Sequence, residues 1–179
     1  MRFKNLFFLL LSVALLTAGC SKKSDNPVNP DGTSGDVLTN SGSMVLNGAG
    51  FSNKTVELSS GVSAYTNSNN YTVCVLYGKS SADSMAVIIA FSGKNTGSFD
   101  WQGLQDSESN YYYDGCTISM YGSNNNMFTV DNGKTVVNVF GEVGKTIEGT
   151  FSGSLKSMDG SQSMTVTGSF KCLRVPDEQ

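Results

Sequence analysis

The sequence predicts an all-β protein: an antiparallel β-sandwich of about eight to ten strands, with a flattened meander β-barrel as the alternative. Three observations predict this class. Apolar and polar residues alternate with period two along most of the chain after residue 40, as strands with one buried face require. The 179 residues include 20 glycines and 3 prolines, which suits strands joined by tight turns. No segment after residue 20 places apolar residues at helical spacing over three turns.

The first twenty residues have the order of an export signal. Arg2 and Lys4 precede an apolar run over residues 6–16, which is too short to cross a bilayer as a helix. The small pair alanine–glycine then precedes Cys20. This arrangement resembles the bacterial lipoprotein signal. The resemblance implies that residues 1–19 form a cleaved signal peptide and that the Cys20 thiol receives a diacylglyceryl group.

Anchoring through Cys20 predicts where the protein resides. The new amino group of a processed lipoprotein is usually acylated as well, for example with palmitate, and two or more acyl chains give stable membrane attachment. Ser21 follows the cysteine where an acidic residue would favour retention in the inner membrane. We therefore expect a lipid-anchored protein of the bacterial cell envelope, in the outer membrane. Whether it faces the periplasm or the outside stays open.

The residues after Cys20 divide into a tether and a domain. Residues 20–37 are polar and contain two of the three prolines, so they bury too little apolar surface to fold and predict a flexible tether. A chain of this length spans about 20–25 Å. Residues 38–179 are long enough for one domain with its own core.

Along the domain, segments with the pattern of β-strands alternate with turn sequences. The expected strands are residues 43–47, 54–59, 62–65, 71–77, 85–91, 115–121, 127–130, 135–140, 147–156 and 164–172. Residues 71–77 and 85–91 are apolar on both faces, which predicts central strands covered by a second layer or by a dimer contact. Asp131-Asn132-Gly133 predicts a hairpin turn. In the last hairpin, Gly153 and Gly168 are expected to make room for Phe170 and Phe151, respectively.

A motif near the C-terminus resembles a known group of proteins. The run G-x-x-G-x-x-I-x-G-T-F-S-G-x-L begins at Gly141, and T-G-x-F begins at Thr167. Both are similar to segments of uncharacterised β-rich outer-membrane lipoproteins of Bacteroidetes-type bacteria. The resemblance implies an extracytoplasmic β-domain and no known activity.

Composition excludes several functions. The chain contains no histidine, which excludes Ser-His-Asp and Cys-His catalysis and imidazole-bound metals. A net charge of −3 argues against a nucleic-acid partner. Besides Cys20, the cysteines are Cys74, Cys116 and Cys172. Their long spacings match no metal motif, and we interpret them as core residues or as one disulfide plus one buried thiol, with the pairing undetermined. No cofactor and no metal are expected.

Residues 100–114 hold the candidate ligand contacts. They contain the single tryptophan, Trp101, and the triplet Tyr111, Tyr112 and Tyr113 beside several acidic residues. Exposed aromatic rings beside carboxylates are suited to binding sugars, although a long loop folded over one end of the domain explains the same residues. A calcium site is a weaker interpretation, because the spacing of the acids does not match a calcium-binding loop.

These observations predict an envelope lipoprotein that is not an enzyme and that binds a protein or glycan partner. An alternative is a structural or assembly accessory with no small ligand. A remote alternative is a hydrolase that uses carboxylates, for which Glu142 and Glu148 are available.

Overall fold

The computed structural model describes residues 40–66, 70–80, 83–105, 111–121 and 126–177. The predicted signal peptide, the lipidated Cys20 and the tether to residue 37 lie outside these ranges. The described residues form ten strands: β1 Ser41–Gly48, β2 Phe51–Thr66, β3 Tyr71–Ser80, β4 Asp83–Ser92, β5 Gly97–Asp100, β6 Gln102–Gln105, β7 Tyr111–Tyr121, β8 Asn126–Phe140, β9 Thr146–Ser157 and β10 Ser163–Leu173. The all-β prediction is confirmed. Across this part of the chain, no helix has the length and apolar character to span a membrane.

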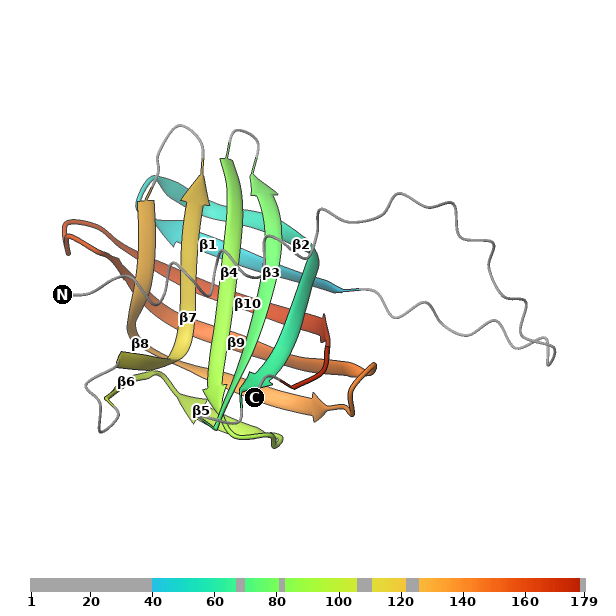
Figure 1. The fold of residues 1–179 in the computed structure, drawn as a ribbon. Coiled ribbons are helices and arrows are strands. Elements are labelled where there is room, and N and C mark those ends of the chain that lie inside the picture. Colours follow the sequence, from blue (N-terminus) through green and yellow to red (C-terminus); the bar gives the residue numbers. More distant parts are fainter. Residues whose placement is uncertain (1–39, 67–69, 81–82, 106–110, 122–125, 178–179) are drawn as a thin grey trace, which may run out of the picture. The chain divides into compact units, whose positions relative to one another are not determined.

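Eight strands close into an antiparallel barrel. In the order β1, β2, β3, β4, β7, β8, β9, β10, each strand pairs with the next, and β10 pairs with β1. The closing ladder runs from Ser41↔Lys171 to Gly48↔Met164. In Figure 1, β3, β4 and β7 stand upright in front, and β9 and β10 cross behind them. The predicted sandwich is wrong, because the ring of paired strands leaves no gap between two separate sheets. The meander barrel, named as the alternative, is correct.

A further strand segment is inserted between β4 and β7. β5 pairs with β8, β6 pairs with β7, and only Trp101 separates β5 from β6. β7 and β8 pair directly only near their connection, at Ile118↔Phe128 to Met120↔Asn126. The inserted segment therefore occupies the place where β7 and β8 part. The interpretation of residues 100–114 as one long loop is wrong at both ends, because β6 occupies Gln102–Gln105 and β7 begins at Tyr111. A four-residue strand such as β6 carries too little alternation to be recognised.

β8 is continuous where the sequence predicts a hairpin. Asn132 and Gly133 pair with Ser154 and Gly153 in the middle of the ladder with β9. The register shifts between Val130 and Asn132, so the Asp-Asn-Gly sequence makes a bulge that bends the strand instead of reversing it. The strands expected at residues 54–59 and 62–65 likewise join into β2 through a register shift.

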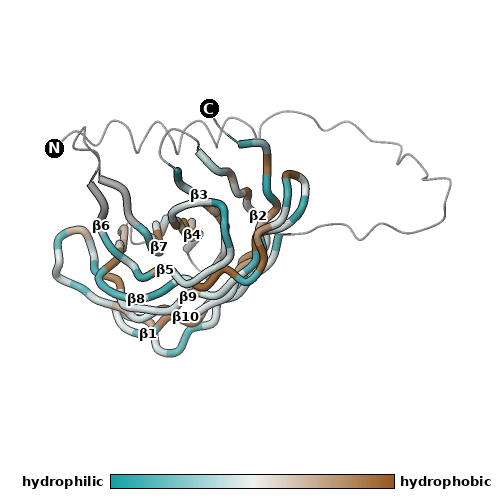
Figure 2. Tube along the Cα trace, turned by 90° about the horizontal axis from the view of Figure 1, so that it is seen from below, coloured by the Kyte–Doolittle hydropathy of each residue, from teal (hydrophilic) through white to brown (hydrophobic). Residues whose placement is uncertain are grey.

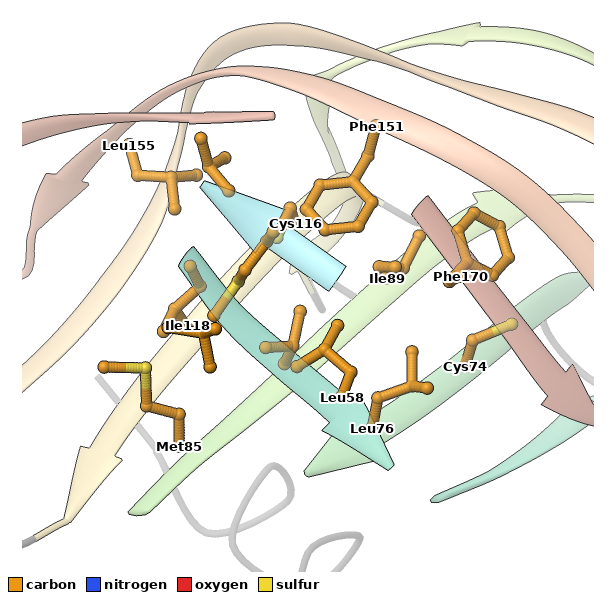
Figure 3. Close-up of a cluster of buried hydrophobic side chains, with 14 of the residues drawn as sticks. Leu58, Cys74, Leu76, Met85, Ile89, Cys116, Ile118, Phe151, Leu155 and Phe170 are labelled. Carbon is orange, nitrogen blue, oxygen red and sulfur yellow. The ribbon is translucent and has the colours of Figure 1, made fainter. Parts of the chain in front are cut away.

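Inward side chains fill the barrel (Figure 3). The buried cluster contains Met44, Leu46, Val56, Leu58, Cys74, Leu76, Met85, Val87, Ile89, Phe91, Trp101, Cys116, Ile118, Met120, Phe128, Val137, Ile147, Phe151, Leu155, Met164, Val166, Phe170 and Cys172. Figure 2 colours the same strands by hydropathy, and hydrophobic and hydrophilic stretches follow one another along them.

The last hairpin is confirmed residue by residue. Gly168 pairs with Phe151, and a Cβ on Gly168 would lie 2.5 Å from the tip of that ring. The other expected glycine contact needs a correction. Phe170 pairs with Gly149, whereas Gly153 makes room for Trp101.

Candidate functional site

The barrel interior is a packed core. An eight-stranded barrel is just wide enough either to be filled by side chains or to hold one small ligand. Leu46, Leu76, Ile89, Ile118 and Leu155 meet there and are fully inaccessible to solvent. The side chains described there are mostly apolar, and the fully buried hydroxyls of Ser63, Thr72 and Thr135 each form a hydrogen bond. Binding at this barrel therefore concerns its ends and its outer surface.

Trp101 belongs to this core. Its side chain is 6% exposed, and its indole N–H donates a hydrogen bond of 2.9 Å to Thr135 Oγ1. Its backbone N–H donates to Gly133 O at 2.9 Å. A Cβ on Gly133 or Gly153 would collide with the indole, so these glycines form its seat. An indole held in this way has little surface left for stacking on a sugar, and a ligand contact by Trp101 stays a prediction.

The tyrosine triplet is placed only through its backbone. Tyr111, Tyr112 and Tyr113 begin β7 and pair with Gln105, Leu104 and Gly103 of β6. Their side chains lie outside the described part of the structure. Their predicted role in ligand contact is untested.

A buried polar cluster lies beside the start of β7, on the outside of the barrel wall. Asp114 is 4% exposed and accepts hydrogen bonds of 3.1 and 3.2 Å from Ser92 Oγ. Burial raises the pKa of the nearby Tyr71, and the charge of Asp114 raises it further. The phenol therefore stays protonated beside the carboxylate. This cluster was not predicted from the sequence, because its members are far apart along the chain.

Glu148, one of the two carboxylates named for the hydrolase alternative, forms a surface ion pair. Glu148 accepts a hydrogen bond of 2.7 Å from Thr146 Oγ1 and forms an ion pair of 3.0 Å with Lys171. The hydrogen bond from Thr146 and then the contact with Lys171 lower the pKa of Glu148, whereas a general acid needs a raised pKa. Glu142 is exposed. Over the described ranges, no three His, Cys, Asp or Glu side chains gather as a metal site would require.

One side of the barrel carries a second apolar layer on its outer surface. The outward residues of β2, β3, β4 and β7 align in rungs across the four strands. One rung is Val62, Val75, Ile88 and Thr117, the next is Ala64, Val73, Ala90 and Gly115, and a third is Ser60, Tyr77, Ala86 and Ser119. We call these three rungs the outer apolar face. They contain no charged residue.

Exposure varies across the outer apolar face. Tyr77 at its rim is 39% exposed. Val75, Ala86 and Ala90 are buried, although their side chains point away from the barrel interior. The double-sided apolar pattern of residues 71–77 and 85–91 indicated this layer from the sequence. The parts supplied by β2 and β7 were missed, since each of those strands alternates ordinarily.

The opposite side of the barrel is polar. There the aligned outward rungs include Thr150, Ser169, Ser43 and Glu57, and next to them Ser152, Thr167, Val45 and Thr55. Ion pairs join Lys171 to Glu148 at 3.0 Å and Lys156 to Asp131 at 2.6 Å. The contrast in polarity between the two sides makes the outer apolar face the candidate functional site. Apolar residues outside a core mark interaction sites where solvent reaches them, as it does at Tyr77 and in part at Val62, Val73 and Ile88.

No protein-family model matches this chain, and the comparisons with curated proteins and with solved structures found no match either.

Proposed function

We propose that the protein is a lipid-anchored lipoprotein of the bacterial envelope, and that its barrel is a protein-binding module. The outer apolar face receives the partner, and the partner to which we commit is a second copy of the barrel. The three uncharged rungs of this face carry the proposal.

The anchor rests on the order of basic residues, apolar run, small residues and Cys20 at the N-terminus. Acyl chains on Cys20 hold the protein at the membrane, because each buried methylene contributes about 0.8 kcal/mol. The polar tether of residues 20–37 leaves the barrel free to turn any side toward a neighbour. It is too polar to cover an apolar surface itself.

A protein partner fits the outer apolar face better than a small ligand or a glycan does. A small ligand inside the barrel would have to displace a packed core. A glycan platform needs several accessible aromatic rings side by side; the single tryptophan is 6% exposed, and on the outer apolar face Tyr77 is the described aromatic residue, at the rim. The half-buried β-branched side chains of Val62, Val73 and Ile88 instead form an even surface that another apolar protein surface can pack against.

A second copy of the barrel is the partner that the absence of charge on this face favours. A surface without charge meets its own image without like-charge repulsion, and a two-fold axis through the central rung would pair Val75 and Ile88 with their counterparts. Strand and rung spacings set an upper limit of roughly 400 Å² per copy, because Val75, Ala86 and Ala90 are already buried. The total of at most about 800 Å² is below the roughly 1,200–2,000 Å² of stable complexes. We therefore expect weak pairing, supported by confinement of both copies to one membrane.

The anchor is tested with Cys20→Ala. Cells fed a labelled fatty acid should label the wild-type protein and leave the variant unlabelled, and the variant should leave the membrane fraction. A labelled variant, or one that still sediments with membranes, contradicts the anchor.

The outer apolar face is tested in cells with the full chain. A photo-crosslinking amino acid at Tyr77, on the rim of the face, should give a product of twice the mass that contains two copies of the chain. Ile88→Lys places a charge in the central rung and should abolish this product. Val45→Lys is the matched control, because Val45 is also an outward β-branched residue but lies on the polar side, 40% exposed; it should leave the product intact.

Two results would refute pairing through this face. One is a product that survives Ile88→Lys at the wild-type level, and the other is a wild-type chain that gives no product of twice the mass. A crosslink from Tyr77 to a glycan would contradict pairing with a second copy and would support the glycan-binding alternative.

A further inference from the structure

The interior of the barrel brings together two of its three buried cysteines. Cys74 in β3, Cys172 in β10 and Cys116 in β7 are fully inaccessible and have free thiols. β3 and β10 are not neighbours in the barrel, because β1 and β2 stand between them. An approach of their side chains therefore needs a local cause.

That cause is the short length of β1. β1 begins at Ser41, opposite Lys171, so the last residues of β10 continue beyond it toward β2. There Val175 N donates to Ser63 O at 2.8 Å, and Ser63 Oγ donates to Leu173 O at 3.1 Å. Asn40 accepts a hydrogen bond of 2.6 Å from Leu173 N. The end of β10 is thus held directly against β2.

Ser63 is also the register partner of Cys74 in β3. The contact between β10 and β2 therefore carries Cys172 to the same level of the barrel as Cys74. The Cys172 thiol lies 3.6 Å from the carbonyl oxygen of Val75, the next residue after Cys74, and it is near enough to the Cys74 thiol to raise the pKa of that group.

The geometry favours Cys172 over Cys116 as the partner of Cys74. A disulfide needs Cα atoms about 4.4–6.8 Å apart, and the end of β10 lies against β2, the direct neighbour of β3. The Cys172 thiol raises the pKa of Cys74, whereas burial is the cause that raises the pKa of Cys116.

We propose that Cys74 and Cys172 are a disulfide pair that closes when the chain folds under oxidising conditions, and that Cys116 stays a free thiol. The two thiols lose two protons and two electrons as the S–S bond forms. A disulfide-containing oxidant, such as a dithiol–disulfide exchange protein or glutathione disulfide, takes them up and becomes two thiols.

Burial sets the time at which the bond forms. Desolvation raises the pKa of Cys74 in the folded barrel, with the neighbouring Cys172 thiol as a further cause, so the reactive thiolate is scarce there. Oxidation therefore belongs to the folding chain, before β10 closes against β1. Once formed, the disulfide links β3 to β10 beside the β1–β10 ladder that closes the barrel.

The experiment counts thiols in the membrane-extracted full chain, purified without reductant. The protein is denatured and labelled with a maleimide before and after reduction. With Cys20 blocked by lipid, the proposal expects one labelled thiol before reduction and three after. Cys116→Ala should give none before and two after. Cys74→Ala should give two in both samples, and peptide mapping of the wild-type chain identifies the linked cysteines even if that variant does not fold.

A second arm separates this inference from the proposed export, on which the bond's presence in the cell rests. The same protein is reduced, denatured and refolded with glutathione and its disulfide. The Cys74–Cys172 bond should return and raise Tm by an amount on the order of 10 °C, as a long closed loop predicts. Three free thiols after this refolding, or a link that includes Cys116, overturns the proposal. A bond that forms here but is missing from the cell-derived chain supports the pair and counts against export to an oxidising compartment.

Discussion

Trp101→Ala removes the side chain that fills the seat between β7, β8 and β9. The indole is 6% exposed and packs against Gly133 and Gly153, two positions where a side chain would collide with it. Truncation of a buried tryptophan costs about 3–5 kcal/mol when its surroundings relax only partly. Gly133 and Gly153 have no side chains that could move into the cavity left by the indole, so the cavity stays largely open. We expect the upper half of that range.

The expected change in Tm is large enough to measure without ambiguity. For a domain of this size, each kcal/mol lowers Tm by about 3–5 °C, so a loss of about 4–5 kcal/mol in Trp101→Ala should lower it by about 12–25 °C. Thermal unfolding followed by circular dichroism provides the assay, because the variant has no tryptophan fluorescence. Tyr121→Ala is the matched control. It removes an aromatic ring that is 50% exposed and should change the free energy of unfolding by no more than about 0.5 kcal/mol.

A companion variant isolates the hydrogen bond. Thr135→Val keeps the shape of the side chain but removes the acceptor of the indole N–H, which should cost about 1–3 kcal/mol. Because Trp101 is the only tryptophan, its own emission reports the denaturant titration of this variant. If Trp101→Ala melts within about 2 °C of Tyr121→Ala, the indole is not part of the core and the reasoning from its burial is refuted.

Three further predictions follow from packing and charge. Phe151→Ala should lower the free energy of unfolding by about 3–5 kcal/mol, since the ring is 1% exposed and sits against Gly168; an unchanged denaturant midpoint would contradict the β9–β10 register. Glu148 has a lowered pKa in the folded state, so its ion pair with Lys171 stabilises the protein above the unfolded pKa and is lost as pH falls through the folded one. Being partly exposed, it contributes under about 1 kcal/mol, and the difference in Tm between wild type and Glu148→Gln should be present near pH 7 and vanish at about pH 2. Asp159 accepts hydrogen bonds from Ser157 and Ser161 that lower its pKa to about 2; a carboxyl resonance titrating near 4 in NMR would show that the β9–β10 turn is not formed as described.

The local sequence pattern predicted the structure correctly where the burial of a single strand face determines it. Residues 147–156 and 164–172 alternate so regularly that a slip by one residue would bury Lys171 and Glu148, which fixed both strands and their register. The apolar character of residues 71–77 and 85–91 on both faces likewise indicated an outer layer. Both conclusions depend only on the residues of the strands themselves and not on which other strands pack against them.

The candidate site was harder to predict because its parts come from strands distant in sequence. Val62, Val75, Ile88 and Thr117 become one rung only after four strands take their register. The cysteine pair is a similar case, since Cys74 and Cys172 meet only because β10 continues past the end of β1.

The sequence by itself determined the all-β class, the inward and outward faces of most strands, and the final hairpin, because alternation of side chains is a local property of each strand. The tertiary structure decided that the strands close into a barrel and that Asp131-Asn132-Gly133 bends β8 instead of turning it. It also decided that Trp101 packs inside. A sandwich and a barrel both bury one face of every strand, so their alternation is the same; they differ only in whether the first and last strands pair, and that depends on curvature accumulated around the whole wall.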